Sequence, residues 1–74
     1  MNAKSLNKKF LGALVLDVNS PKKIRGYMFL GAHEIDGDKD ALNVKWLHPN
    51  GEVITTTHGV SDVYGWIKNG EFYP

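Results

Sequence analysis

The chain has 74 residues, of which 42% are hydrophobic and 23% are charged, and its formal net charge is +1. This length predicts one domain near the lower limit for a self-sufficient core, and the composition is that of a soluble globular protein. Because the sequence contains no cysteine, disulfides and thiolate metal sites are excluded.

The first segment is polar, and we expect residues 1–8 to form a flexible basic arm before a single domain over residues 9–74. Basic residues followed by the apolar run from Phe10 to Leu16 imitate a secretory signal peptide only loosely. The run is short, Asp17 follows it directly and there is no A-x-A cleavage site. No apolar run approaches the roughly 18 residues that span a membrane. We therefore expect a cytoplasmic protein that does not bind membranes.

The apolar run from Phe10 to Val18 predicts a buried strand. A helix is the alternative, because Leu6, Phe10 and Leu14 recur at a spacing of four residues. The strand is favoured because Gly12 would cost a helix about 1 kcal/mol relative to alanine. Residues 19–21, with the sequence Asn-Ser-Pro, are turn formers that end this segment.

A second strand is expected from Ile24 to Ile35, since this stretch is rich in aromatic and branched side chains. Alternation along a strand separates its side chains into two sets. The set expected to face the core comprises Ile24, Met28, Leu30 and Ala32. The opposite set comprises Arg25, Tyr27, Phe29 and His33.

The opposite set suggests a binding surface. Together with Lys22 and Lys23 just upstream, it places cations beside two aromatic rings. Such a surface suits single-stranded nucleic acid, whose phosphates bind cations and whose bases stack on rings. The alternative is that Tyr27 and Phe29 cover a second core face, because both sides of a strand are buried in a small barrel.

Two further strands are predicted by alternation and by turn residues. Asp36–Asp40 contains the Asp-Gly signal of a hairpin. Leu42–Leu47 alternates cleanly, with Leu42, Val44 and Trp46 directed inward. His48–Gly51 is a tight turn, and Glu52–His58 is a threonine-rich strand that suits a half-exposed sheet.

The C-terminal region predicts a short helix. Ser61 can cap a helix that starts at Asp62 and ends at Asn69–Gly70. Its shared apolar face would comprise Val63, Trp66 and Ile67. The alternative is a hairpin that turns at residues 68–70 and returns residues 71–73 along residues 64–67. The predicted fold is mainly β: a small antiparallel barrel or strongly bent sheet of four to five strands, with a short C-terminal helical turn.

Part of the first half resembles a cold-shock domain, a five-stranded OB barrel that binds single-stranded nucleic acid. The likeness covers roughly residues 12–40. It rests on Gly12, on Asn19, on the run Arg25-Gly26-Tyr27-Met28-Phe29-Leu30, and on the acidic loop Asp36–Asp40.

This resemblance implies that Tyr27 and Phe29 stack bases and that Arg25 contacts a phosphate or a base. The sequence departs from the family pattern at Met28, where the family has a small residue. It departs again at Leu42–Lys45, where the family has aromatic residues and histidine. The likeness therefore covers the first two strands and the acidic loop, and does not extend to the third strand.

The second half is similar to SH3-like or Tudor-type barrels, in which a strand that ends in tryptophan precedes a tight turn. The likeness rests on Val44, Trp46, Pro49 and Gly51. It is a similarity of architecture, and it agrees with the first on a small barrel.

Recognisable catalytic machinery is absent from the sequence. None of the three serines lies in a nucleophile elbow, and there is no glycine-rich phosphate loop. His33, His48 and His58 fall in different predicted elements without the spacing of zinc ligands. We therefore expect a non-enzymatic protein with no cofactor and no metal site.

The charges divide along the chain. Residues 1–30 carry six cations and one anion, and residues 31–74 carry three cations and seven anions, so +5 and −4 give the net +1. A basic face can bind nucleic acid, and an acidic face can bind a charged protein.

Two binding functions follow. The first is single-stranded nucleic-acid binding through Lys22, Lys23, Arg25, Tyr27, Phe29, Lys45 and Trp46. The alternative is an adaptor or inhibitor module, of possible viral or mobile-element origin, that docks on a larger protein through Asp62, Trp66, Glu71 and Tyr73.

Overall fold

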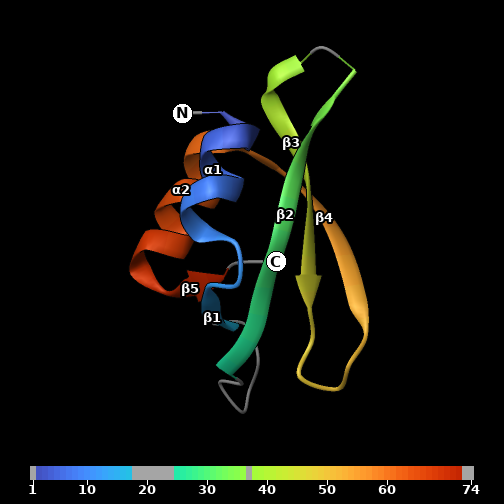
Figure 1. Ribbon diagram of the computed structural model, residues 1–74, viewed down its shortest axis with the longest axis vertical. Coiled ribbons are helices and arrows are strands. Elements are labelled where there is room, and N and C mark those ends of the chain that lie inside the picture. The colour runs from blue at the N-terminus through green and yellow to red at the C-terminus, as the bar shows by residue number, and fades with distance from the viewer. Residues whose placement is uncertain (1, 18–24, 37, 73–74) are drawn as a thin grey trace.

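The computed structural model describes residues 2–17, 25–36 and 38–72. Within them the chain forms one sheet and two helices, which lie together on one side of the sheet (Figure 1). The mainly β fold with a short C-terminal helix is confirmed. The elements are α1 (Ala3–Phe10), β1 (Leu14–Asp17), β2 (Arg25–Ile35), β3 (Asp38–Leu47), β4 (Val53–Gly59), α2 (Val60–Asn69) and β5 (Glu71–Phe72).

The strand order in the sheet is β4-β3-β2-β1-β5. Strands β1 to β4 are antiparallel to their neighbours, whereas β5 is parallel to β1. The register shifts at Val15/Leu16, at Phe29/Gly31 and at Glu34/Ile35. An extra residue at such a shift bends its strand. With β4 and β5 at its two edges, the described sheet fits the bent-sheet form of the prediction.

Both predicted hairpins are confirmed. Ile35 of β2 pairs with Asp38 of β3 across the Asp-Gly turn. In the turn between β3 and β4, the Gly51 N–H donates to the His48 carbonyl oxygen at 2.9 Å. Gly51 has a φ of +94°, which favours glycine at this position.

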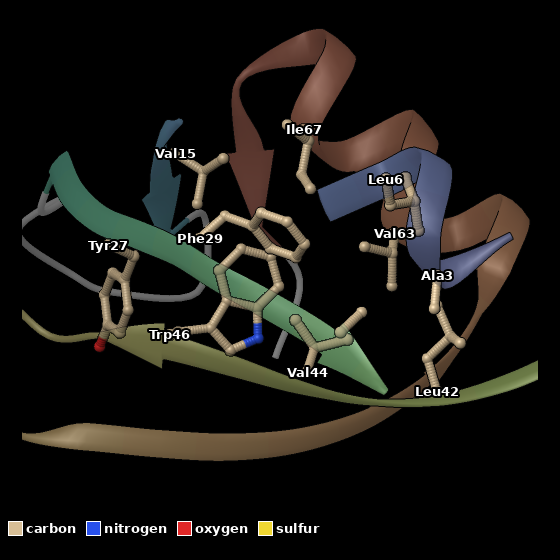
Figure 2. Packing of buried hydrophobic residues seen from close by; sticks show 11 residues of the cluster. Ala3, Leu6, Val15, Tyr27, Phe29, Leu42, Val44, Trp46, Val63 and Ile67 are labelled. Atoms are coloured by element: carbon tan, nitrogen blue, oxygen red, sulfur yellow. The ribbon is translucent and has the colours of Figure 1, made fainter. Parts of the chain in front are cut away.

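The core lies between the sheet and the two helices (Figure 2). Its two largest fully buried side chains are Trp46 and Phe29, which are directly opposite on β3 and β2 with ring centroids 5.6 Å apart. Trp46 Nε1–H donates to Thr56 Oγ1 at 2.7 Å, so its polar group is satisfied inside the core. Leu42, Val44 and Trp46 are all fully buried, which confirms the inward face predicted for β3.

The prediction of a flexible arm over residues 1–8 is wrong from Ala3 onward, because residues 3–10 are helical. They form α1, which Asn2 caps by accepting a hydrogen bond from the Ser5 N–H at 2.9 Å. Leu6 is 0% exposed and anchors the helix to the core. The strand predicted from Phe10 begins only at Leu14, because the chain first turns through Gly12, whose φ is +88°.

The helix α1 also covers a backbone edge of the sheet. β1 pairs with β2 only as far as Phe29, so β2 continues past the end of its neighbour. There Asn7 Nδ2 donates to the Ala32 carbonyl oxygen at 3.0 Å, and the Ala32 N–H donates to Asn7 Oδ1 at 2.7 Å. The amide side chain of Asn7 thus makes the two backbone hydrogen bonds that a neighbouring strand would make at Ala32.

The predicted faces of β2 are exchanged in the structure. Tyr27 and Phe29, predicted to face outward, are 7% and 0% exposed and belong to the core. Met28, predicted to face the core, is only partly buried and points to the other side, and Leu30, which stands at the register shift, is also only partly buried. Ala32 is buried as predicted, because the register shift at Phe29/Gly31 reverses the alternation beyond it.

The helix α2 is longer than predicted and begins two residues earlier. Its N-cap is Gly59, with no side-chain capping bond, so the prediction of Ser61 as the cap is wrong. Val63 and Ile67 are buried as predicted, and Trp66 is partly buried against the core. Gly70, with a φ of +75°, ends the helix.

After α2 the chain continues into β5, which pairs with β1. The alternative hairpin, in which residues 71–73 return along residues 64–67, is therefore wrong. The turn predicted at residues 19–21 lies outside the described residues, as do Ile24 and Tyr73.

Candidate functional site

The aromatic part of the predicted nucleic-acid site is buried. Phe29 and Trp46 are both 0% exposed, and Tyr27 packs its ring edge-on against His48 with centroids 4.8 Å apart. A ring that stacks on a base must present its face to solvent. Tyr27 and Phe29 are therefore not available as stacking rings, nor is Trp46 as an edge of the groove. The three residues belong to the single core, and β2 does not have the two buried faces that the alternative expected.

The cationic part of that site is described only in part. Lys45 is exposed on β3. Arg25 begins β2, but its side chain lies outside the described part of the structure, as do Lys22 and Lys23. Among the predicted contacts whose side chains are described, Lys45 alone is exposed.

Four apolar side chains form a row across the face of the sheet opposite the helices. Their cross-strand pairs join four strands in one line: Leu14 of β1 pairs with Met28 of β2, Met28 with Leu47 of β3, and Leu47 with Val53 of β4. We call Leu14, Met28, Leu47 and Val53 the outer row. Paired side chains point to the same face, so the four residues are direct neighbours.

The orientation of the outer row follows from its sequence neighbours. Each member stands next to a residue that faces the helices, because side chains alternate along a strand. These inward neighbours are Val15, Phe29, Trp46 and Ile54. Leu14 is 60% exposed and Val53 is 55% exposed, while Met28 and Leu47 between them are partly buried. The row is therefore an apolar strip on the side of the sheet that the two described helices leave uncovered.

Two charged residues stand near the outer row, Lys45 of β3 and the exposed Glu52, which precedes Val53 in the chain. Lys45 lies two residues from Leu47 on the same face and is exposed. The two described carboxylates of β2 and β3 are on the other face. Glu34 pairs with the buried Leu42, and Asp40 lines a hollow beside α2. A ligand on the outer face thus meets an apolar strip with an adjacent cation.

A second surface combines cations with aromatic rings where α1 meets α2. Lys9 Nζ lies 5.4 Å from the ring centroid of Phe10 and 5.7 Å from that of Tyr64. Lys68 Nζ lies 5.8 Å from the same Tyr64 ring. Phe10 and Tyr64 are partly exposed, and their centroids are 5.8 Å apart. Sequence reasoning missed this cluster, because it joins residues 9 and 10 to residues 64 and 68, which lie more than 50 positions further along the chain.

Among the described residues predicted for protein docking, Asp62 and Glu71 lie at opposite ends of α2. Asp62 is exposed in the first turn of the helix, whereas Glu71 follows its C-terminal end on β5. Trp66 is partly buried, with its ring edge-on to His58 at a centroid distance of 4.5 Å. Burial lowers the pKa of His58 below its ordinary value, and the charge of Asp62 partly opposes this. These contacts anchor α2 to β4.

A hollow of about 420 Å³ lies beside the start of α2. Its lining comprises Asp40, Gly59, Val60, Ser61 and Tyr64. Within residues 2–17, 25–36 and 38–72, no three histidine or carboxylate side chains come together to hold a metal ion. No helix in the described part is long and apolar enough to cross a membrane.

Comparison with protein-family models, with curated proteins and with solved structures finds no match to this chain. The likenesses to cold-shock domains and to SH3-like barrels gain no support from these comparisons.

Proposed function

We propose that this chain is a small non-catalytic module that binds another protein through the outer row. The observation that carries the proposal is the alignment of four large apolar side chains, in register, on the uncovered face of the sheet. Soluble monomers leave single apolar residues exposed, but contiguous apolar patches mark interaction sites. Met28, at the centre of the row, has a flexible side chain that adapts to a partner's shape.

The partner that fits this face presents apolar side chains with carboxylates beside them. Apolar groups would cover the strip from Leu14 to Val53, and a carboxylate would pair with Lys45. The described carboxylates of β2 and β3, Glu34 and Asp40, lie on the opposite face, so among the charges of these two strands only Lys45 faces the partner; Glu52 precedes Val53 at the end of the strip. Electrostatic complementarity of this kind sets specificity and association rate.

Peptide display tests the proposal without knowledge of the natural partner. A random peptide library would be selected on the immobilised protein and counter-selected on the variant Leu14→Lys/Val53→Lys. Because both replaced side chains are more than half exposed, the variant is expected to stay folded. Enriched peptides should combine apolar residues with aspartate or glutamate. They should bind the unmodified protein at least about tenfold more tightly than the variant, because the variant lacks two apolar contacts.

Leu11→Lys is the matched control. Leu11 is an exposed apolar residue, 64% accessible, that does not belong to the outer row. The selected peptides should bind this variant as tightly as the unmodified protein. Selection that yields no enriched peptides, or peptides that lose affinity equally in the control, would contradict docking at the outer row.

A second candidate function is binding of single-stranded nucleic acid, now at the cluster of Lys9, Phe10, Tyr64 and Lys68. Its support is the placement of two ammonium groups within 6 Å of a partly exposed tyrosine ring. Cations that bind phosphates next to rings that stack bases are the usual means of holding a single strand.

Fluorescence anisotropy of a labelled mixed-sequence single strand, titrated at several salt concentrations, tests this candidate. If both lysines bind phosphates, Lys9→Gln/Lys68→Gln should reduce the slope of log K against log salt by about 1.4. Lys45→Gln, on the opposite face of the sheet, should leave the slope unchanged. Absence of binding at low salt, or an equal change in the control, would rule this surface out.

A further inference from the structure

The sheet protects most of its unpaired backbone. At one edge, β5 is only two residues long, and the part of β2 that extends past β1 is bonded by the Asn7 side chain at Ala32. Such measures matter because an unpaired strand edge presents a row of free N–H and C=O groups to other chains. The other edge is β4.

The edge strand β4 has none of the usual protection. It is seven residues long, Val53–Gly59, and contains no lysine, arginine, aspartate, glutamate or proline. Its register with β3 runs without a shift over seven pairs, so there is no bulge to twist it away. In the described part of the chain it pairs with β3 alone. In Figure 1, β4 lies on the side of the sheet away from α1.

We propose that β4 pairs antiparallel with β4 of a second copy of this chain, so that two sheets join into one. The sequence of β4 is self-complementary about Thr56. A two-fold axis there places Thr56 opposite Thr56, Thr55 opposite Thr57, and Ile54 opposite His58. Every pair joins side chains of the same face, and no charge meets a like charge. This inference is independent of the proposed docking at the outer row.

A second copy fits this edge better than an unstructured segment of another protein. The partner's β4 is already held in extended form by its own β3, so pairing costs little conformational entropy. An interface with the same strand on both sides also closes as a two-fold dimer instead of extending into a fibre. Threonine pairs, such as Thr55 with Thr57, are favourable across antiparallel strands.

The test compares two double variants that differ only in the sign of one charge. In Thr55→Glu/Thr57→Glu, the new carboxylate at position 55 would face the one at position 57 of the second copy. The two like-charge pairs that result should weaken dimerisation about tenfold or more. In Thr55→Glu/Thr57→Lys, the same positions carry opposite charges, and dimerisation should be retained. Inside one copy, position 57 is directly opposite the neutral Asn43, and the hydrogen bond from Thr57 Oγ1 to Asn43 is lost equally in both variants.

Sedimentation over a concentration series measures the dimerisation constant, and circular dichroism verifies that each variant is folded. Loss of the dimer in the Glu/Glu variant and its retention in the Glu/Lys variant would support the proposal. A chain that stays monomeric at every concentration would overturn it. A dimer that responds equally to both variants would overturn it too, because the contact would then not follow the pairing of β4.

Cross-linking tests the register directly, since the chain has no cysteine of its own. A Thr55→Cys copy mixed with a Thr57→Cys copy should form a mixed disulfide on oxidation. Thr55→Cys alone should cross-link several-fold less, because its two sulfurs are separated along the strands. Equal cross-linking in the mixture and in the single variant would contradict the register centred on Thr56.

Discussion

Phe29→Ala is expected to lower the free energy of unfolding by about 3–5 kcal/mol, the usual cost of removing a fully buried phenylalanine. Phe29 is 0% exposed and packs its ring against Trp46 at a centroid distance of 5.6 Å. A domain of 74 residues typically has a total stability of about 4–11 kcal/mol. The substitution should therefore remove a large part of the stability, and all of it only if the unmodified protein lies at the lower end of that range.

The control for this prediction is the preceding residue on the same strand. Met28 points to the uncovered face, and Met28→Ala should cost less than about 1 kcal/mol. Urea unfolding followed by far-ultraviolet circular dichroism gives both values. If Phe29 were instead an exposed stacking ring, its removal would cost no more than the removal of Met28, and that result would contradict the described core.

The contrast between Met28 and Phe29 also explains why the faces of β2 could not be read from the sequence. Both faces of this strand carry large apolar residues, so alternation alone does not say which one meets the helices. The register shift at Phe29/Gly31 then reverses the alternation, which puts Ala32 on the same side as Phe29. Gly31, whose φ is +126°, stands at that shift, and an isolated glycine inside a strand is a sequence signal of a bulge that alternation alone does not use.

By contrast, β3 was predictable because its faces differ in kind. Leu42, Val44 and Trp46 alternate with the polar residues Asn43 and Lys45. In such a pattern only the apolar face of the strand can face the core. The turns on either side carry Asp-Gly and Pro-Asn-Gly, which fix the hairpins locally. The β3–β4 pair accordingly follows the prediction closely.

The outer row did leave a signal in the sequence. Each of the four strands has two adjacent apolar residues at the level of the row, as in Met28-Phe29 and Trp46-Leu47. Because neighbours on a strand point to opposite faces, adjacent apolar residues predict an apolar patch on both sides of the sheet. The local sequence does not contain the register that aligns Leu14 with Val53 across two other strands. That alignment is a property of the tertiary fold.

The N-terminal helix was missed because its apolar pattern is short. Ala3 and Leu6 are its buried residues, and the rest of the segment is polar enough to suggest an arm. A helix of eight residues is not stable by itself, and its stability comes from packing. The Leu6–Phe10 spacing fits a helix, but Leu14 continues the same spacing into the apolar run that follows Gly12, and that run favours a strand.

Leu6→Ala tests this packing, and it is expected to lower the free energy of unfolding by about 2–5 kcal/mol, the range for leucine in a closed core. The loss follows from the position of Leu6, which is 0% exposed in the core cluster that also contains Val63 and Ile67 of α2. The same substitution should loosen α1, so that the amide proton of Ala32, which bonds Asn7, exchanges with solvent faster. Denaturant unfolding and hydrogen exchange measure the two effects.

Lys8→Ala is the matched substitution on the exposed side of the same helix, and it should change stability by no more than about 0.5 kcal/mol. If residues 1–8 were an arm in solution, both variants would be equally stable, and the exchange rate at Ala32 would be the same in each. A large difference between them would instead show that α1 belongs to the folded unit. In that case a chain without α1 should also lose the protection of the β2 edge, because Asn7 would no longer bond Ala32.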